Sequence, residues 1–133
     1  MCHNLAARRN ARSLTRLYDQ HLAPSGLSVS QYSILAIIDE RDGITIAELA
    51  RIMVMERTTL MRALGPLEKA GLIERRQEPG ERAITFHLSA IGHAKVEQAA
   101  PLWQEAQQSF ERRAGSERAA KLREIILEIG FPD

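Results

Sequence analysis

The sequence predicts a mainly helical fold that carries one small β-hairpin. Along most of the 133 residues, apolar side chains recur every three or four positions, which is the spacing of a helix buried on one face. Residues 84–88 instead alternate apolar and polar side chains with the period of two that is typical of a strand. Capping sequences and glycines divide the helical pattern into separate segments. These three observations together indicate several short helices and a single hairpin.

The size and composition of the chain fit a single domain that spans residues 1–133. Hydrophobic residues make up 44% of the sequence and charged residues 26%, which is ordinary for a globular protein. The formal net charge is only +1, so any surface that binds a polyanion has to be local. The lone cysteine, Cys2, excludes an internal disulfide framework, and no apolar run or leader pattern indicates a membrane span or a secretory signal. We therefore expect a cytoplasmic protein.

Two helices are predicted in the first part of the chain. Residues 3–22 place leucines on one face of a helix and arginines on the other. Pro24 and Gly26 end this segment, because proline cannot continue a helix and glycine accepts a positive φ angle. A capping-box sequence at residues 28–31 begins the second helix, which ends before the Asp-Gly turn at residues 42–43.

Two further helices follow, with only a few residues between them. Thr45 and Glu48 have the spacing of a capping box, which predicts that a helix begins near Ile46. The next helix is expected to begin near Glu56, with leucines on one side and arginines and threonines on the other. Gly71 stands where a residue in the left-handed conformation would end this helix.

A hairpin and two more helices complete the predicted order. The strand at residues 84–88 is expected to pair with residues 72–77. Pro79 and Gly80 form the turn between the two strands, because proline fixes φ and glycine takes the positive value. Ser89 can cap the long helix that follows, and a Gly-Ser pair separates this helix from the last one.

This order of elements is that of a winged helix-turn-helix, whose second helix enters the major groove of DNA. The groove is about 12 Å wide, which is close to the diameter of a helix. The hairpin that follows would be the wing, and a residue just past its tip would reach the minor groove. The sequence therefore predicts binding to double-stranded DNA. The candidate DNA-binding residues are Arg51, Arg57, Thr58, Thr59, Met61, Arg62, Arg75, Arg76 and Arg82.

Each type of candidate side chain has its own expected contact. The hydroxyls of Thr58 and Thr59 suit base edges or phosphates, and Arg57 and Arg62 can reach phosphates or guanine. Arg82 is long enough to enter the minor groove, whereas the arginine pair before the wing tip would reach backbone phosphates. Any one of these residues alone is more typical of a solvated surface, and glutamates lie among the arginines. The combination of motifs favours DNA binding over that alternative.

Several stretches resemble the MarR family of bacterial transcriptional regulators. Those that resemble the family's helix-turn-helix are residues 46–51, 57–62 and 67–73. Arg82, followed after five residues by Leu88, Ser89 and then Gly92, resembles the end of the family's wing signature. The similarity extends over residues 14–96, and the layout of helices is similar to the end of the chain.

Two positions depart from the pattern of this family. Members usually carry an aspartate two residues before the wing-tip arginine, and this chain has Gly80 there. Arg82 therefore loses an orienting carboxylate unless Glu78 or Glu81 replaces it. Many members carry glycine in the turn of the helix-turn-helix, and this chain has Val54, a β-branched residue poorly suited to a positive φ angle. We therefore predict that the turn between the two helices takes a different backbone path.

The resemblance implies a sequence-specific repressor that binds a pseudo-palindromic operator as a homodimer and is released by a small-molecule effector. Residues 28–90 would form the DNA-binding lobe, and residues 1–24 and 91–133 the dimerisation helices. The two recognition helices of the dimer would then lie about 34–36 Å apart. The sequence supports pairing independently, because the last helix carries apolar residues with little chain left to cover them. These residues are Ile125, Ile126, Ile129 and Phe131.

Effectors of the family are commonly small aromatic anions, held between the dimerisation helices and the DNA-binding lobe. Arg16, His21, Tyr32 and Trp103 are candidates for the charge and the aromatic walls of such an effector pocket. Trp103 and Tyr18 also have the spacing of ordinary core or dimer-packing residues, which is the more common role. The sequence leaves both roles open.

Other interpretations are weaker but stay open. A winged helix can serve as a protein-interaction module without DNA binding, and Cys2 permits thiol-based redox sensing although it stands earlier than the reactive cysteine of peroxide-sensing relatives. A metal site formed by Cys2, His3 and His21 is disfavoured because these residues lie far apart along one helix. We expect no enzyme, cofactor or metal, because the sequence contains no catalytic constellation. His87 and His93 are expected to face solvent.

Overall fold

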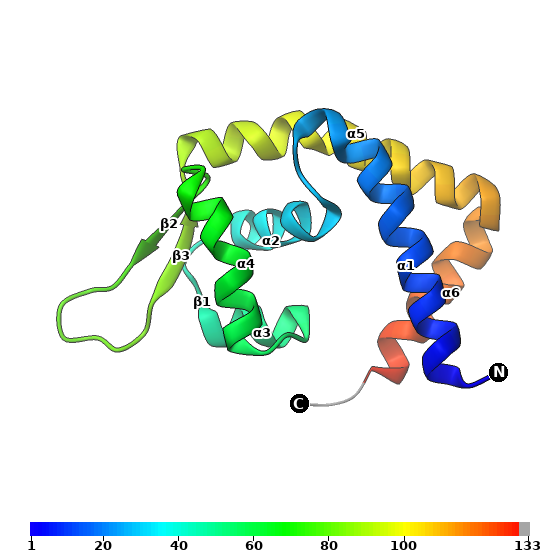
Figure 1. The fold of residues 1–133 in the computed structure, drawn as a ribbon, viewed down its shortest axis with the longest axis horizontal. Helices are drawn as coiled ribbons and strands as arrows, with labels where there is room; N and C mark the ends of the chain where they lie inside the picture. Colours follow the sequence, from blue (N-terminus) through cyan, green and yellow to red (C-terminus); the bar gives the residue numbers. More distant parts are fainter. Residues whose placement is uncertain (131–133) are drawn as a thin grey trace. The chain divides into compact units, whose positions relative to one another are not determined.

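The computed structural model describes residues 1–130 of the chain, which form a mainly helical fold with three short strands (Figure 1). The helical segments are α1 (His3–Leu22), the 3-10 turn η1 (Ala23–Ser25), α2 (Val29–Glu40), α3 (Ile46–Met53), α4 (Arg57–Lys69), α5 (Ala90–Ala114) and α6 (Ser116–Ile129). The strands are β1 (Ile44–Thr45), β2 (Ile73–Arg76) and β3 (Thr85–Leu88). The predicted fold class, mainly α with a small hairpin, is confirmed.

The chain divides into two compact units. The first unit contains Met1–Val29 and the chain from Ala100 onward, and the second contains Ser30–Ala99. Helix α5 begins in the second unit and ends in the first.

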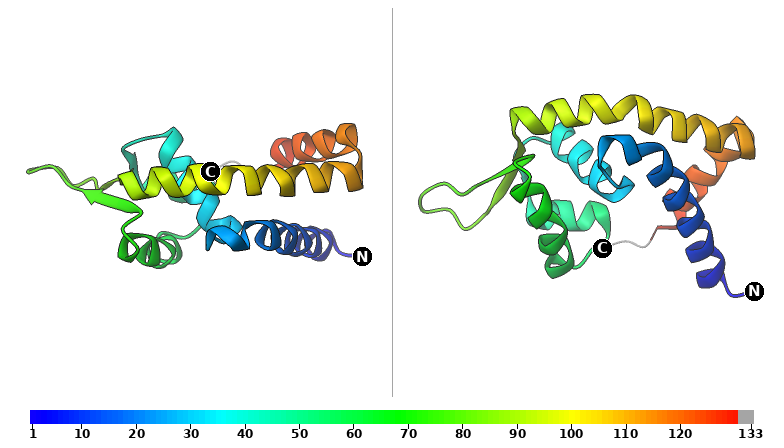
Figure 2. Two further views of the ribbon diagram at one scale, coloured as in Figure 1. Left: turned by 90° about the horizontal axis from the view of Figure 1, so that it is seen from above. Right: turned by 45° about the horizontal axis from the view of Figure 1, so that its top comes forward.

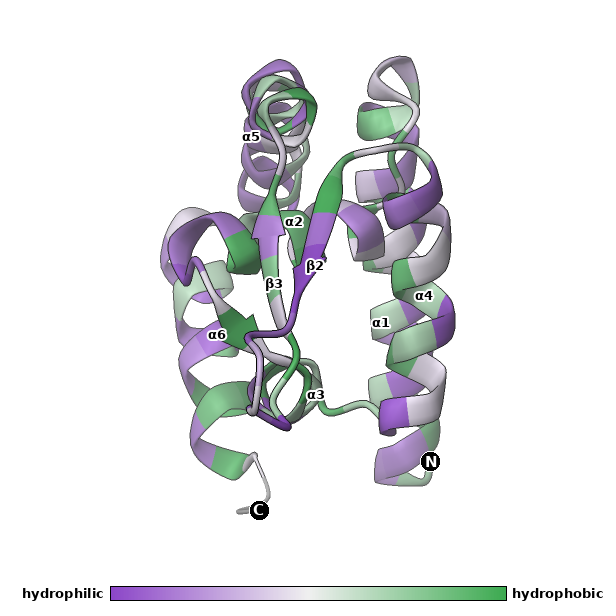
Figure 3. Cartoon of the chain, turned by 90° about the vertical axis from the view of Figure 1, so that its left-hand side faces the viewer, coloured by the Kyte–Doolittle hydropathy of each residue, from purple (hydrophilic) through white to green (hydrophobic). Residues whose placement is uncertain are grey.

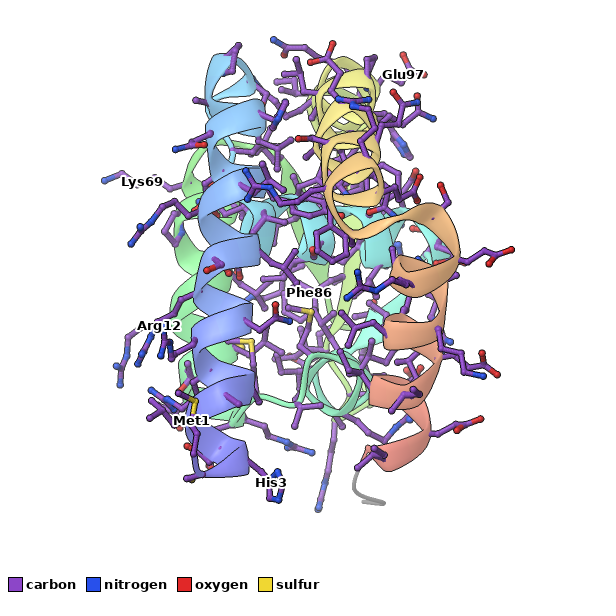
Figure 4. The ribbon with its side chains drawn as sticks, turned by 90° about the vertical axis from the view of Figure 1, so that its right-hand side faces the viewer. Met1, His3, Arg12, Lys69, Phe86 and Glu97 are labelled. Atoms are coloured by element: carbon purple, nitrogen blue, oxygen red, sulfur yellow. The ribbon has the colours of Figure 1, made fainter. Side chains whose placement is uncertain are left out.

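A three-stranded antiparallel sheet, with strand order β1-β3-β2, belongs to the second unit. Phe86 of the middle strand pairs with Ile44 of β1, and its side chain is fully buried. The side chains of Lys69 on α4 and Glu97 on α5 point outward instead (Figure 4). Apolar residues of α2, α3 and α4 form the core with Phe86 because their helical spacing turns one face inward. The fully buried members are Ile34, Leu35, Ile38, Leu49, Leu60, Leu64 and Leu67.

Local capping bonds fix where the helices of the second unit begin and end. The Thr45 hydroxyl oxygen accepts a hydrogen bond from the Glu48 amide at 3.2 Å, so α3 begins where its capping sequence predicts. Gly71 has a φ of +74° after the last turn of α4, and the next amide, that of Leu72, donates to the Leu67 carbonyl at 3.0 Å. Both predicted helix boundaries are therefore confirmed.

The hairpin of β2 and β3 is shorter in its paired part than the sequence predicts. Pairing covers Ile73–Arg76 and Thr85–Leu88, and the chain between the two strands projects away from the other elements of this unit (Figures 1 and 2). The predicted turn at Pro79 and Gly80 is present: the Glu81 amide donates to the Glu78 carbonyl at 3.0 Å, and Gly80 has a φ of +85°.

The prediction that Val54 would force a different path on the turn between α3 and α4 is wrong. Val54 has a φ of 53° and a ψ of 51°, the left-handed conformation that glycine usually adopts. Its amide donates to the Arg51 carbonyl at 3.2 Å, and the Met55 amide donates to the Ala50 carbonyl at 2.9 Å. These bonds satisfy the last carbonyls of α3 and require a left-handed residue, so they override the side-chain preference.

The first unit contains α1, η1, α6 and the second half of α5. The Tyr18 hydroxyl of α1 donates to the Gln107 side chain of α5, and Asp19 accepts a hydrogen bond from the Val29 amide at 2.7 Å. Large apolar residues nevertheless stay exposed on α6: Leu122, Ile125, Ile126, Leu127 and Ile129. Phe131, predicted to continue this stripe, lies outside the described residues. Within residues 1–130, no helix has the length and apolar character of a membrane span.

Candidate nucleic-acid interface

Helix α4 presents two different faces. Leu60, Leu64 and Leu67 are at most 2% exposed and pack into the core of the second unit. The first two turns of the helix are exposed on the other side, and Met61 is half-buried between the two faces. The exposed candidate side chains of this helix are Arg57, Thr58, Thr59 and Arg62. They lie where a helix that reads a groove needs polar side chains, and their contacts with DNA stay a prediction.

Three of the candidate arginines have no acidic partner. Within residues 1–130, Arg57, Arg62 and Arg82 form no ion pair, and all three are exposed. Arg51 is exposed as well, in the last turn of α3. A guanidinium without an internal carboxylate keeps its donors available for a phosphate or a guanine base. The glutamates that lie among the arginines in sequence therefore do not neutralise these three.

The wing places Arg82 just past its tip. Gln77 holds the two sides of the wing together, because its side-chain amide donates to the backbone carbonyl of Glu81 at 3.0 Å. Neither Glu78 nor Glu81 forms an ion pair with Arg82 among the described residues. No glutamate therefore replaces the orienting carboxylate that the family usually has at Gly80.

The adjacent arginines of β2 point to opposite faces of the sheet, because side chains alternate along a strand. Arg75 pairs with Glu68 of α4 at 2.5 Å and lies over the Phe86 ring, 5.7 Å from its centroid. Arg76 instead pairs with Glu74 of its own strand at 3.1 Å. The strand becomes hydrophilic toward these residues (Figure 3). Their predicted contacts with phosphates stay untested, but Arg75 already has a structural role that the sequence did not reveal.

We expect the Arg75→Ala variant to lower the free energy of unfolding by about 1 kcal/mol, because it removes both the ion pair and the cation–π contact. The matched control is Arg76→Ala, whose ion pair is exposed and local, with an expected loss of about 0.3 kcal/mol or less. Urea denaturation followed by circular dichroism measures both values. Equal losses would show that the contact between Arg75, Glu68 and Phe86 contributes no more stability than the exposed ion pair of Arg76.

The hairpin is joined to α5 at a tight junction. The Ser89 hydroxyl donates to the Gly71 carbonyl at 2.5 Å and accepts a hydrogen bond from the Gly92 amide at 3.0 Å. A Cβ atom at Gly92 would lie within 3.0 Å of the Leu72 carbonyl group, so only glycine permits this approach. The cap at Ser89 was predicted from the sequence. The packing role of Gly92 was not, since it depends on a residue 20 positions away.

The prediction that His87 faces solvent is wrong. Its side chain is only 14% exposed, and it lies in hydrogen-bond contact with Asp42 at 2.8 Å and with the Thr85 hydroxyl at 3.0 Å. The reason is the pairing of β1 with β3, which brings the turn at Asp42 and Gly43 against this part of β3. His93 is 58% exposed, as predicted, and pairs with Asp39 at 3.1 Å.

The four candidate effector residues are distributed over both units. Arg16 and His21 of α1 and Trp103 of α5 belong to the first unit, whereas Tyr32 belongs to the second. His21 approaches Glu105 at 3.8 Å, and Trp103 is half-buried. Tyr32 is buried, and this burial, with the nearby Asp39 carboxylate, raises the pKa of its phenol. Their role in binding an effector stays a prediction.

The first unit contains an apolar groove that the sequence did not indicate. Its volume is about 220 Å³, and residues of α1, α5 and α6 line it. The lining residues are Leu14, Tyr18, Gln107, Phe110, Glu111, Ala119, Leu122, Arg123, Ile126 and Leu127. Burial and the Glu111 carboxylate raise the pKa of the Tyr18 phenol at the wall of this groove. None of the four candidate effector residues lines it, so the groove is separate from the predicted pocket.

Cys2 stands immediately before α1 and is exposed. Its side chain forms no hydrogen bond that caps the helix, although its backbone carbonyl accepts a hydrogen bond from the Ala6 amide at 3.0 Å. Among the described residues, no group of histidine, cysteine, aspartate and glutamate side chains is arranged to hold a metal ion. The redox role of Cys2 stays a prediction.

Helices α3 and α4, the turn at Gly71 and the hairpin of β2 and β3 define a winged helix-turn-helix protein. The sequence pattern of the MarR family matches residues 27–83, which contain the helix-turn-helix and most of the wing. The transcriptional regulator HosA of Escherichia coli O111:H- is 26% identical over 132 residues, which cover 94% of this chain and 98% of HosA.

Solved structures extend this similarity to nearly the whole chain. The transcriptional regulator MosR of M. tuberculosis, crystallised in complex with DNA, is 34% identical with a TM-score of 0.87 over 97% of this chain and 93% of MosR. A mutant MarR from E. coli, complexed with operator DNA, shares the fold with a TM-score of 0.85 at 23% identity, over 95% of this chain and 91% of MarR. The chain belongs to the MarR family of transcriptional regulators.

Proposed function

We propose that this protein binds a pseudo-palindromic operator in double-stranded DNA as a homodimer and regulates transcription there. The observation that carries the proposal is the exposed start of α4, where Arg57 and Arg62 have no acidic partner among the described residues. Arg82 on the adjacent wing supplies a third free guanidinium. The DNA complex of MosR, at 34% identity, supports the same use of this fold. Arg62 and the other exposed side chains at the start of α4 would contact base edges in the major groove. Arg82 would enter the minor groove.

The homodimer is supported by the apolar surface of the first unit. Leu122, Ile125, Ile126, Leu127 and Ile129 of α6 are between 37% and 74% exposed. A second copy of the chain would cover these side chains and fill the adjacent groove, because exposed apolar surface of this kind usually pairs. A two-fold dimer then presents two copies of α4 to one face of the duplex.

The regulation itself is proposed to be repression, relieved by a small aromatic or anionic effector. The candidate residues for binding it stay those predicted from the sequence: Arg16, His21, Tyr32 and Trp103. Occupation of an operator excludes other proteins from the same DNA, so repression requires no further activity. In this role the protein would act in the cytoplasm and would catalyse no reaction.

The test is selection of duplexes from a random library by the wild-type protein and by two variants. We expect the wild type to enrich a pseudo-palindrome and its affinity to fall steeply with salt concentration. Arg62→Ala should lose the preference for one base at a single major-groove position in each half-site. The discrimination against the other bases at that position should fall by about tenfold to hundredfold. Arg82→Ala should instead lose the preference for flanking A·T pairs.

Lys69→Ala is the matched control, since Lys69 is an exposed cation at the far end of the same helix. It should select the same sequence as the wild type. If the wild type enriches no sequence even at low salt, the proposed function is wrong. If Lys69→Ala loses as much affinity as Arg62→Ala, the assignment of base reading to the start of α4 is wrong.

A further inference from the structure

Val54 combines a strained backbone with an exposed apolar side chain. Within residues 1–130 it is the only residue other than glycine with a positive φ angle, at 53°. Its side chain is β-branched, and this residue class adopts the left-handed conformation only at a cost in free energy. The residue is also 90% exposed, the highest value among the large hydrophobic residues that are exposed in the described chain. Neither property is typical of a residue that serves only the fold.

The packing of the chain does not explain this valine. The turn is held by backbone hydrogen bonds, from Val54 to Arg51 and from Met55 to Ala50, and glycine would form both equally well. An isopropyl group that is 90% exposed contributes little hydrophobic stabilisation. Strain of this kind is maintained at functional sites, where the side chain has a use outside the fold.

The position of Val54 indicates what that use is. It lies in the turn of the helix-turn-helix, two residues before Glu56, which precedes the first turn of α4. Ile52, Met53 and Met55 are half-buried, so Val54 is the exposed member of a short apolar run. The free guanidinium of Arg57 follows within three residues. An apolar group beside an unpaired cation fits a duplex, whose surface offers sugar and thymine methyl groups next to phosphates.

We propose that Val54 contacts DNA directly, with its isopropyl group packed against a deoxyribose or a thymine methyl at the edge of the major groove. The inference rests on the proposed function and adds an apolar DNA contact to the polar ones of α4. The left-handed conformation projects this side chain out of the turn. The contact with DNA would offset the free-energy cost of that conformation.

The test compares substitutions of Val54 for folding stability and for affinity to the duplex that the wild type selects. Val54→Gly removes the strain and should raise the melting temperature by about 3 °C. It should nevertheless weaken DNA binding by about fivefold to twentyfold, because the contact is lost. Val54→Ala should bind equally weakly without the gain in stability, and Val54→Ile should bind like the wild type. A merely structural valine would not produce opposite changes in stability and affinity.

A second arm identifies the DNA group. Replacing thymine by uracil at single operator positions removes only the methyl group; a loss of wild-type affinity that Val54→Ala does not show identifies a thymine contact. If no position has this effect while Val54→Ala still binds weakly, the contact is with a sugar. Ile91→Ala, which truncates an apolar residue that is 62% exposed on α5, is the control and should bind normally. Wild-type affinity in Val54→Gly and Val54→Ala would overturn this inference alone, whereas a wild type that binds no duplex contradicts the proposed function.

Discussion

Replacing Gly92 with alanine is expected to lower the free energy of unfolding by about 3 kcal/mol or more. The added Cβ would lie only 2.0 Å from the carbonyl oxygen of Leu72, far closer than two non-bonded atoms can approach. This carbonyl cannot rotate away, because it also accepts the hydrogen bond of the Ser89 amide at 3.0 Å. Either α5 or the start of β2 has to move, and the bonds between Ser89, Gly71 and Gly92 would be lost with that movement.

Chemical denaturation of both proteins measures this loss, and Gly65→Ala is the matched control. Gly65 lies inside α4, and a Cβ there would meet no atom within 4 Å. Alanine at this position should therefore raise the free energy of unfolding by about 0.5–1 kcal/mol, through its higher helix propensity. A Gly92→Ala protein as stable as the wild type would show that α5 and the hairpin accommodate the extra atom without cost.

The parts of the fold that could be predicted from the sequence have their causes within a few neighbouring residues. The cap at Thr45, the left-handed Gly71 and the turn at Gly80 each depend on side chains or glycines no more than four positions away. Apolar spacing likewise separated the buried from the exposed side of α4. Periodicity and capping therefore placed the helix-turn-helix correctly.

Contacts between distant residues could not be predicted in this way. His87 faces Asp42 instead of solvent because two strands pair, and Gly92 is required by a carbonyl of another element. Val54 shows the same limit at short range: its side-chain preference argued against a left-handed turn, and the need to satisfy the end of α3 decided otherwise. In each case a hydrogen bond or a packing contact of the folded chain decided the outcome, and at Val54 it outweighed an intrinsic conformational preference.

The candidate interface contains both predictable and unpredictable features. The exposure of Arg57 and Arg62 follows from helical spacing, but the sequence could not tell which arginines would be neutralised by the glutamates among them. The structure separates them, because Glu68 and Glu74 are engaged by the two arginines of β2. The arginines of α4 and the wing tip are left without acidic partners among residues 1–130, and these carry the proposed function.

Ile126→Glu is expected to convert the proposed dimer into monomers and to weaken binding to the full operator by at least about a hundredfold. Ile126 is 52% exposed on α6 and lines the apolar groove that α1 and α5 complete. In a dimer this position would be buried, and a buried carboxylate without a partner costs several kcal/mol. A monomer has only one copy of α4. It therefore lacks the increase in affinity that arises when the second copy of α4 is held close to its half-site by the first.

Analytical ultracentrifugation measures the association, and titration with full and half operators measures the binding. Ile126→Glu should bind the full operator and the half operator with similar affinity, because a monomer contacts only one half-site in either duplex. Ile91→Glu is the control for adding an acid to an exposed isoleucine: it lies in the second unit and should leave the dimer intact. If Ile126→Glu stays dimeric, α6 is not the dimer surface. If it is monomeric and still binds the full operator as tightly as the wild type, recognition does not require two copies of α4.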